Sequence, residues 1–394
     1  MNRKRAAFLV LSLAVLIPVV TGVLWSAATE RRADDGEDSL YKYLSIFSEV
    51  FGLVRSSYVD ETDAGALLAG ALEGAGDALD PFSTYVPVDG VAAYEKALAA
   101  GRSRSGLELA DDQGIVFVLA VEAGSPAATA GFVTGDIVAE VDGRSTRALA
   151  AWQLAALLAG EPGASLACKV LREGENLDLT LALADYPAPA PRIERVREQP
   201  VLHPGRFAEG AAAAIRPLLA ELAAAGADRL MVDLRGAAGG SAPAAYEVAG
   251  LFATGSLGKL SGRDGVVRDF GAAGEPVWRG RLVVLVDGYT QGPAEVLAAA
   301  LKQLAGAQLV GVPSFGWAGE RELVALEGGA RLHLTTAFYS GPDGEPIIEG
   351  LEPDLLVDDL AATFGEREKP LSERILEHGI DLLVEDADGE RRAA

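Results

Sequence analysis

The spacing of hydrophobic positions divides this chain into segments. An uncharged run from Ala6 to Thr29 is followed by a charged segment over 30–38, which we interpret as a linker. From Ser39 to Leu79 the apolar residues recur three and four positions apart, a period that predicts amphipathic helices. We therefore expect a helical N-terminal region over 39–100, in which Asp80-Pro81 marks a turn or extended segment.

Residues 101–186 have the pattern of a small β-rich domain. The run GIVFVLAVEAG predicts a strand, and SLACKVLREGENLDLTLAL predicts a hairpin that turns near Gly174. Between them, AWQLAALLAG predicts an amphipathic helix. The proline-rich segment from Asp185 to Arg192 indicates a boundary after this domain.

The pattern over 187–365 is that of alternating helices and strands. The strand-like runs RLMVDLRG, RLVVLVDG and AQLVGVPSFG are apolar without alternation and are separated by helical runs. Such strands predict a largely parallel sheet covered on both faces. Over 366–394 we expect a C-terminal amphipathic helix and an acidic tail. The expected fold class is a multidomain α/β protein.

The N-terminal apolar run is long enough to cross a bilayer, since about 20 apolar residues suffice for a transmembrane helix. Arg3, Lys4 and Arg5 precede it and favour a cytoplasmic N-terminus. We expect residues 1–29 to form an uncleaved signal anchor; the alternative is a signal peptide cleaved at the small residues 26–28. Both interpretations place the rest of the chain outside the cytoplasm, either anchored (in the periplasm of a Gram-negative cell) or secreted after cleavage.

Composition narrows the functions that we consider. The 394 residues include 34 Lys plus Arg and 57 Asp plus Glu, a net charge of -23. A surface this acidic repels phosphate backbones, so we expect no nucleic-acid binding. The single cysteine, Cys168, can form no intramolecular disulfide. The three histidines lie far apart without ligand-like spacing, and we expect neither a metal site nor a cofactor.

Six blocks of the sequence, in order, resemble the C-terminal processing peptidases, which are tail-specific serine peptidases with a PDZ domain. SPAATAGFVTGDIVAEVDG resembles a bacterial PDZ domain; the peptidase blocks are LDPFSTYV, MVDLRGAAGG, VVLVDGYTQGPAEVLAAAL, LVGVPSFG and LHLTTAFYSGPDGEPIIEGLEPDLLV. The resemblance covers about residues 41–380. It implies a crotonase-like α/β core with an inserted PDZ domain that captures a protein's free C-terminus. It also implies cleavage by a Ser-Lys dyad, in which the buried lysine is the general base.

The resemblance breaks at the catalytic positions. It places the family's nucleophile on Gly292, its base on Trp317 and a supporting glutamine on Arg321. Glycine has no side chain that could attack, and an indole is not a base. We therefore expect a pseudopeptidase with no intact catalytic residue. Gly239 and Gly240 match the loop whose backbone N–H groups would form the oxyanion hole, although the three residues before them depart from the family pattern.

An active peptidase with a relocated nucleophile is the alternative prediction. Thr290, Ser314 or Ser241 would supply a hydroxyl, and Glu295 matches a family glutamate. A turn or helix-cap role is the simpler interpretation of each hydroxyl. His333 alternates within RLHLTT, which predicts a solvent-facing position on a strand.

The resemblance assigns peptide binding to the PDZ domain. Backbone N–H groups of its loop would hold a terminal carboxylate while the peptide adds a strand to the sheet edge, and two leucines would line an apolar pocket. The loop consists of Ser105, Gly106, Leu107, Glu108 and Leu109. A degenerate PDZ domain with a purely structural role is the alternative.

We accordingly expect a membrane-anchored extracytoplasmic protein that binds polypeptide C-termini or partner proteins as an adaptor or scaffold. The resemblance also implies a homodimer formed through the amphipathic segments 39–56 and 370–384, which in a monomer would be ordinary packing helices.

Overall fold

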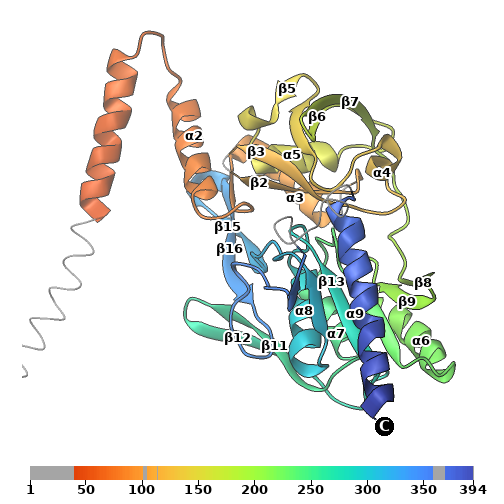
Figure 1. The fold of residues 1–394 in the computed structure, drawn as a ribbon. Coiled ribbons are helices and arrows are strands. Elements are labelled where there is room, and N and C mark those ends of the chain that lie inside the picture. Colours follow the sequence, from red (N-terminus) through yellow and green to blue (C-terminus); the bar gives the residue numbers. More distant parts are fainter. Residues whose placement is uncertain (1–39, 101–103, 113, 358–368, 394) are drawn as a thin grey trace, which may run out of the picture. The chain divides into compact units, whose positions relative to one another are not determined.

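The structure is a computed structural model that describes residues 40–100, 104–112, 114–357 and 369–393. The predicted anchor over 1–29 and the linker over 30–38 lie outside the described residues. Within the described part, no helix combines the length and the apolar character that a membrane span requires. The chain separates into two compact units, Met1–Ala71 and Leu72–Ala394 (Figure 1).

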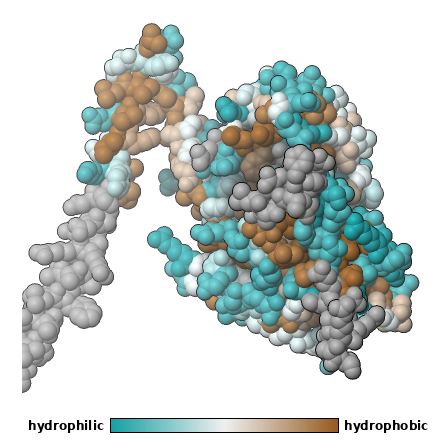
Figure 2. All heavy atoms as spheres, viewed as in Figure 1, coloured by the Kyte–Doolittle hydropathy of each residue, from teal (hydrophilic) through white to brown (hydrophobic). Residues whose placement is uncertain are grey.

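Two helices follow the predicted helical period at the start of the described chain. The first covers residues 40–57, and α2 covers Ala64–Asp77. Large hydrophobic side chains remain exposed along the first helix, much of which is brown in Figure 2. The exposed residues include Leu40, Tyr41, Tyr43, Leu44, Ile46, Phe47, Val50 and Leu53. This helix therefore presents more apolar surface than an isolated helix in water would be expected to carry.

The β-rich domain is a sheet in the order β2-β3-β4-β6-β7, with β5 added on β4. Its strands are β2 (Leu107–Asp112), β3 (Ile115–Val121), β4 (Ile137–Val141), β5 (Arg144–Ser145), β6 (Ser165–Arg172) and β7 (Glu175–Ala182). The helices are α4 (Pro126–Ala130) and α5 (Ala151–Leu158), with a 3-10 turn over Thr146–Ala148. Residues of both helices and of the inner sheet face form one core. Among the described strands, β2 lies at the sheet edge and pairs with β3.

The α/β core is built on a second sheet in the order β17-β14-β13-β10-β9-β8. The strands are β8 (Arg192–Val196), β9 (Gln199–His203), β10 (Arg229–Asp233), β13 (Arg281–Val286), β14 (Gln308–Gly311) and β17 (Leu355–Leu356). All neighbours pair in parallel except β8 and β9. The predicted parallel sheet is therefore confirmed, and the antiparallel edge strand β8 is an addition.

Helices cover both faces of this sheet, which explains why its strands lack an alternating pattern. Leu230 and Val232 of β10 face the core that contains residues of α6 (Ala211–Ala224), α7 (Ala242–Ala249) and α8 (Pro293–Leu304). Met231, between them, faces the opposite core with Ile375 of α9 (Leu371–Ala393). Helix α9 continues to Ala393, so the segment predicted as a C-terminal helix and acidic tail is one helix.

A third sheet has the order β1-β16-β11-β12, with β15 also paired to β16. Its strands are β1 (Thr84–Val86), β11 (Gly255–Gly262), β12 (Gly265–Ala272), β15 (Gly319–Ala325) and β16 (Arg331–Tyr339); a 3-10 turn over Glu327–Gly329 joins the last two. Helix α3 (Val88–Ala99) follows β1. The sequence pattern did not predict the hairpin β11–β12, because most of β12 is exposed and its glycines and charges resemble a loop.

Candidate functional site

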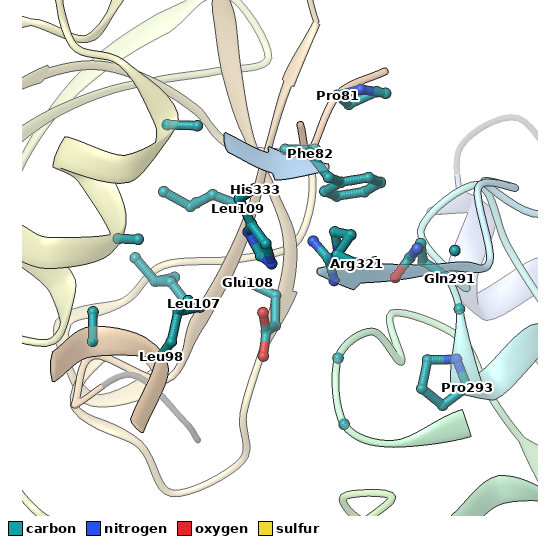
Figure 3. A pocket seen from close by; sticks show the side chains of 18 of the residues that line it. Pro81, Phe82, Leu98, Leu107, Glu108, Leu109, Gln291, Pro293, Arg321 and His333 are labelled. Carbon is teal, nitrogen blue, oxygen red and sulfur yellow. The ribbon is translucent and has the colours of Figure 1, made fainter. Parts of the chain in front are cut away.

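A cavity of about 580 Å³ lies between the β-rich domain and the α/β core. Its walls come from α3, β2, α5, the loop after β10, the turn before α8, and strands β15 and β16 (Figure 3). Of the residues singled out in the sequence, the cavity brings together Leu107, Glu108, Leu109, Gly239, Gly240, Ser241, Gly292, Arg321 and His333. Part of the peptide-binding loop therefore shares one cavity with Gly292 and Arg321, whereas Ser105, Gly106 and Trp317 are not among the lining residues.

The turn before α8 keeps a special backbone shape at Gly292. This residue has φ 59° and ψ -111°, a conformation that side-chain-bearing residues rarely adopt, and it is the N-cap of α8. A Cβ atom added to it would meet no other atom within 4 Å. The space for a nucleophilic side chain is therefore present, and the side chain is absent.

The Thr290 side chain is hydrogen-bonded within the same turn and to the residue that follows β10. Its Oγ1 donates to the carbonyl oxygen of Leu234 at 2.9 Å and accepts from the backbone N–H of Asp287 at 2.9 Å. Its side chain is fully buried, and Thr290 is not among the residues that line the cavity. Burial raises the pKa of the neighbouring Asp287, whose carboxylate accepts the N–H of Gly236. These groups fix the turn.

Glu295 joins this turn to the loop after β14. Its Oε2 accepts the N–H of Gly292 at 2.8 Å, and its Oε1 accepts the N–H of Gly316 at 2.7 Å and the hydroxyl of Ser314 at 2.5 Å. Ser314 Oγ also accepts the N–H of Leu351 at 2.7 Å. Both Glu295 and Ser314 are buried and neither lines the cavity. Their contacts are those of a structural brace between two loops.

Trp317 does not face the cavity. Its ring packs on Phe338 with 5.9 Å between the ring centroids. On β16, Phe338 is adjacent to Tyr339, which lines the cavity, and successive side chains of a strand point to opposite faces. Trp317 contributes only its carbonyl oxygen to the turn, accepting from Gln291 Nε2 at 3.0 Å. The position that the resemblance assigns to the base is therefore turned away.

The glycine loop after β10 lies directly against the β-rich domain. Gly239 and Gly240 have φ values of 74° and 99°, and a Cβ on Gly239 would come within 2.3 Å of Glu108 Oε1. Glu108 extends from β2 and pairs with Arg206 of the core at 3.2 Å. Arg206 also pairs with Glu122, which accepts the hydroxyl of Tyr186 at 2.5 Å. Desolvation raises the pKa of Glu108, and Arg206 opposes the shift.

The loop before β2 is closed by its own hydrogen bonds. Leu107 donates its backbone N–H to Ser105 Oγ at 3.1 Å, and the carbonyl oxygen of Gly106 accepts the N–H of Glu122 at 2.8 Å. Gly106 has φ 78°, and a Cβ there would come within 2.1 Å of the Cβ of Ser125. A terminal carboxylate bound at this loop would compete with Ser105 for the N–H of Leu107.

An apolar groove runs between the edge strand β2 and helix α5. Leu107 and Leu109 form its strand side, and Leu154, Ala155 and Leu158 form its helix side. Among the described strands, β2 is the edge strand of this sheet, the position at which a peptide strand can be added. Leu107 and Leu109 thus lie where an apolar peptide side chain would be received.

His333 corrects our expectation of a solvent-facing residue. It is partly buried, lines the cavity, and shares a hydrogen bond of 2.7 Å between its Nδ1 and the hydroxyl of Tyr94 on α3. Desolvation and then the charge of Arg321 lower its pKa to about 4, so the imidazole is neutral at physiological pH. The alternation in RLHLTT correctly predicted a strand. It could not predict that helix α3 contacts the side of the strand on which His333 lies.

Several residues of the cavity carried no local sequence signal. Arg206 lies in a loop with no motif, and Tyr94 lies on an ordinary amphipathic helix. Their roles arise from contacts with residues 98 and 239 positions away in the chain. Among the described residues, no cluster of His, Cys, Asp and Glu side chains could hold a metal ion.

Comparisons with known proteins match both domains that enclose the cavity. Residues 201–357 match peptidase family S41, and residues 117–172 match the PDZ domain. The chain is 25% identical to carboxy-terminal processing protease CtpA of Bacillus subtilis over 358 residues, covering 88% of this chain and 76% of that protein. It is 25% identical over 353 residues to a carboxy-terminal-processing protease of Bartonella bacilliformis, covering 86% of this chain and 81% of that protein.

A solved structure agrees with these matches. The photosystem II D1 C-terminal processing protease superposes with a TM-score of 0.64 at 25% identity, covering 79% of this chain and 92% of that protein. The order of a β-rich PDZ domain followed by an S41 peptidase core is the one described above. This chain belongs to the C-terminal processing peptidase family, with an S41 peptidase core and a PDZ domain.

Proposed function

We propose that this chain is a non-catalytic member of its family that binds the C-terminal segments of other polypeptides as an adaptor or scaffold. One observation carries the proposal. The groove between β2 and α5 opens into a cavity where Gly292 stands at the nucleophile position, while Trp317 at the base position packs outside the cavity. The chain thus keeps the means to hold a peptide beside a centre that lacks a nucleophile and a base.

Binding would proceed by strand addition to β2. An extended peptide would add to the sheet along β2 and place alternate side chains between Leu107, Leu109 and α5. Main-chain hydrogen bonds would supply sequence-independent affinity, and the apolar groove would favour apolar side chains. The same peptide would pass the glycine loop at Gly239 without meeting a reactive group.

The geometry gives little support to a relocated nucleophile at Thr290 or Ser314. Both hydroxyls are buried in hydrogen bonds that hold loops together, away from the cavity lining. Ser241 is the one aliphatic hydroxyl among the described residues that line the cavity, and its Oγ caps α7 by accepting the N–H of Ala244 at 3.4 Å. The only imidazole lining the described cavity, His333, is bonded to Tyr94.

To test the proposal, binding of a polypeptide and its cleavage are measured in the same experiment. The purified full-length chain is mixed with an unstructured polypeptide that ends in apolar residues, and fluorescence anisotropy and the intact mass of the polypeptide are recorded over one time course. We expect binding without any loss of mass. Ala155→Phe, which fills the groove, should abolish binding, whereas Ala156→Phe on the same helix but outside the cavity lining should not. Cleavage that survives repurification and disappears in Ser241→Ala, Thr290→Ala or Ser314→Ala would refute the proposal.

A second variant, Gly292→Ser, tests whether the nucleophile is the one group that the site lacks for cleavage. Gly292→Ser has room for its side chain, but no described residue near it supplies a base in place of the family lysine. We expect this variant to bind peptide and still cleave nothing. Cleavage by Gly292→Ser alone would show that the rest of the catalytic machinery had survived.

We also propose that residues 1–29 anchor the chain in the membrane and that the described part is extracytoplasmic. The support is the apolar run behind Arg3, Lys4 and Arg5. A protein held by a membrane span resists extraction by alkaline carbonate, and its external part is digested by protease added to spheroplasts. Release by carbonate, or protection from the protease, would refute this part of the proposal.

A further inference from the structure

Most charged groups that face the cavity already have partners within the protein. Glu108 of β2 pairs with Arg206 of the core at 3.2 Å. Glu320 of β15 accepts the hydroxyl of Tyr339 at 2.5 Å. Asp111, also on β2, accepts a backbone N–H from its own turn at 2.8 Å. These contacts hold the carboxylates in the wall.

Arg321 differs from these groups. Among the residues that the structure describes, no carboxylate lies within ion-pair distance of its guanidinium and no acceptor is hydrogen-bonded to it. Its guanidinium carbon lies 4.9 Å from the centre of the Phe82 ring, a stacking contact that leaves the edge N–H groups available. Phe82 in turn contacts Phe315, with 6.1 Å between the ring centroids. Among the described residues, this ring contact is the one close interaction that the guanidinium makes with a neighbouring side chain.

The surroundings of Arg321 include one carboxylate that feels its charge, Glu108, but that carboxylate is already paired with Arg206. In Figure 3 it lies between His333 and Gln291, on the wall of the cavity. His333 is neutral at physiological pH because desolvation and Arg321 itself lower its pKa to about 4. Gln291 is an uncharged amide. An arginine presented in this way, with five N–H donors in a fixed fork, matches the two oxygens of a carboxylate.

We infer that Arg321 binds a carboxylate of the polypeptide that occupies the cavity. This inference rests on the proposed function. The carboxylate has two sources: an acidic side chain of the bound segment, or its C-terminus. The second source is relevant because the loop at Ser105 already uses its side chain to accept the N–H of Leu107. In either case Arg321 gives the groove a preference for one charged group in an otherwise apolar ligand.

The test compares three labelled peptides of the same apolar extended sequence by fluorescence anisotropy, with the full-length chain at low ionic strength. The first carries one glutamate and an amidated end, the second has glutamine in its place and an amidated end, and the third has glutamine and a free C-terminus. Each is titrated with the wild-type chain, Arg321→Gln and Arg321→Lys. Arg263→Gln, in the exposed turn between β11 and β12, is the control for an equal loss of charge outside the cavity.

We expect Arg321→Gln to weaken binding of a carboxylate-bearing peptide about tenfold, which corresponds to about 1.4 kcal/mol. Arg321→Lys should recover part of the loss, Arg263→Gln should change nothing, and about 0.5 M salt should reduce the difference because the site is partly exposed. A loss confined to the glutamate peptide assigns the contact to a side chain. A loss confined to the free C-terminus assigns it to the terminal carboxylate.

Two other outcomes overturn the inference, and they can be told apart. If Arg321→Gln binds all three peptides as the wild type does, while Ala155→Phe still abolishes binding, the groove binds peptide and Arg321 does not contribute. If the wild-type chain binds none of the peptides and Ala155→Phe makes no difference, the proposed function itself fails, and this inference fails with it.

Discussion

At the scale of single residues, Glu295 explains how the turn before α8 keeps its shape with a glycine at position 292. One carboxylate connects the N–H of Gly292 on the turn before α8 with Ser314 and Gly316 on the loop after β14. None of these contacts needs a serine at 292 or a lysine at 317. The frame is therefore maintained by groups that take no part in chemistry.

The pKa of Glu295 gives a prediction about stability. Burial raises this pKa from its usual 4.5 to about 7. The folded chain thus holds a proton that the unfolded chain has released, so the stabilisation is fully present below pH 4.5 and is lost as the pH rises through 7. At about 1.4 kcal/mol per pKa unit, the loss is up to about 3 kcal/mol. The midpoint of thermal unfolding, measured from pH 4.5 to 8, should fall more steeply in the wild type than in Glu295→Gln. If the unfolding midpoint of both proteins changed with pH by the same amount, the raised pKa of Glu295 would not contribute to stability.

The sequence indicated some of these residues but not their contacts. Gly292 and Glu295 were identified from a block that resembles the family motif, and the opening of α8 at Pro293 agrees with the preference of proline for the first helical turn. The bond between Glu295 and Ser314 spans 19 positions and two loops. A pattern of neighbouring residues cannot predict a contact between residues this far apart in the chain. From the sequence, Ser314 could therefore be identified only as a serine in a loop, without its partner.

At the scale of elements, the loop that leads into β2 depends on a glycine for two separate reasons. Gly106 has φ 78° and is so close to Ser125 that a Cβ would overlap it at 2.1 Å. Gly124 has a similar φ of 74° but has open space around its Cβ position. A side chain at either site would strain the backbone, but only a side chain at Gly106 would also overlap a neighbour. Comparing substitutions at the two sites therefore measures the effect of the overlap.

We expect Gly106→Ala to destabilise the PDZ domain more than Gly124→Ala does. A positive φ costs a side-chain-bearing residue about 1–2 kcal/mol at both sites, and only Gly106 adds the overlap with Ser125. Chemical denaturation followed by circular dichroism measures both variants. Equal losses of stability would show that the loop before β2 relaxes enough to remove the overlap.

Elements were predicted best where burial dictates the pattern. Strands β10 and β13 are buried on both faces, and their continuous apolar runs could be recognised as members of a parallel sheet. Strand β12 has Phe270 as its one fully buried side chain and exposes Val266 and Val267. Its pairing with β11 is dictated by neighbours in space, and the sequence therefore gave no sign of that hairpin.

At the scale of the whole molecule, the exposed helix over 40–57 has a surface that suggests a partner. Apolar residues spaced alternately four and three apart form a seam along it: Leu40, Leu44, Phe47, Phe51 and Val54. A seam with this spacing is the one that pairs helices in coiled coils. We propose that it pairs with the same helix of a second copy.

Disrupting the seam should reduce self-association of the full-length chain. Leu44→Lys with Phe47→Lys places two charges in the seam, whereas Ser45→Lys with Ser48→Lys places the same charges beside it. Sedimentation velocity over a range of concentrations should show the first variant at lower mass than the second. A wild-type chain that is monomeric at all concentrations would remove the basis for this proposal.

The site as a whole could not be predicted, although its parts could. The family resemblance supplied Leu107, Gly239, Gly292 and Arg321 as separate positions, and the first and last of them are more than 200 residues apart in the chain. Their meeting in one cavity depends on how the PDZ domain packs on the core, which involves Arg206. Long-range packing of this kind is not contained in hydrophobic periodicity.

The orientation of Trp317 has an evolutionary consequence. Its backbone adopts φ 56°, and its ring is fixed on the side of the strand that carries Phe338. Under the proposed non-catalytic function, a lysine at 317 would replace a ring that packs on Phe338 outside the cavity lining. A return to proteolysis would then need substitutions at both 292 and 317, and a side chain at 317 that reaches the cavity. Selection would in that case act on what the cavity can hold.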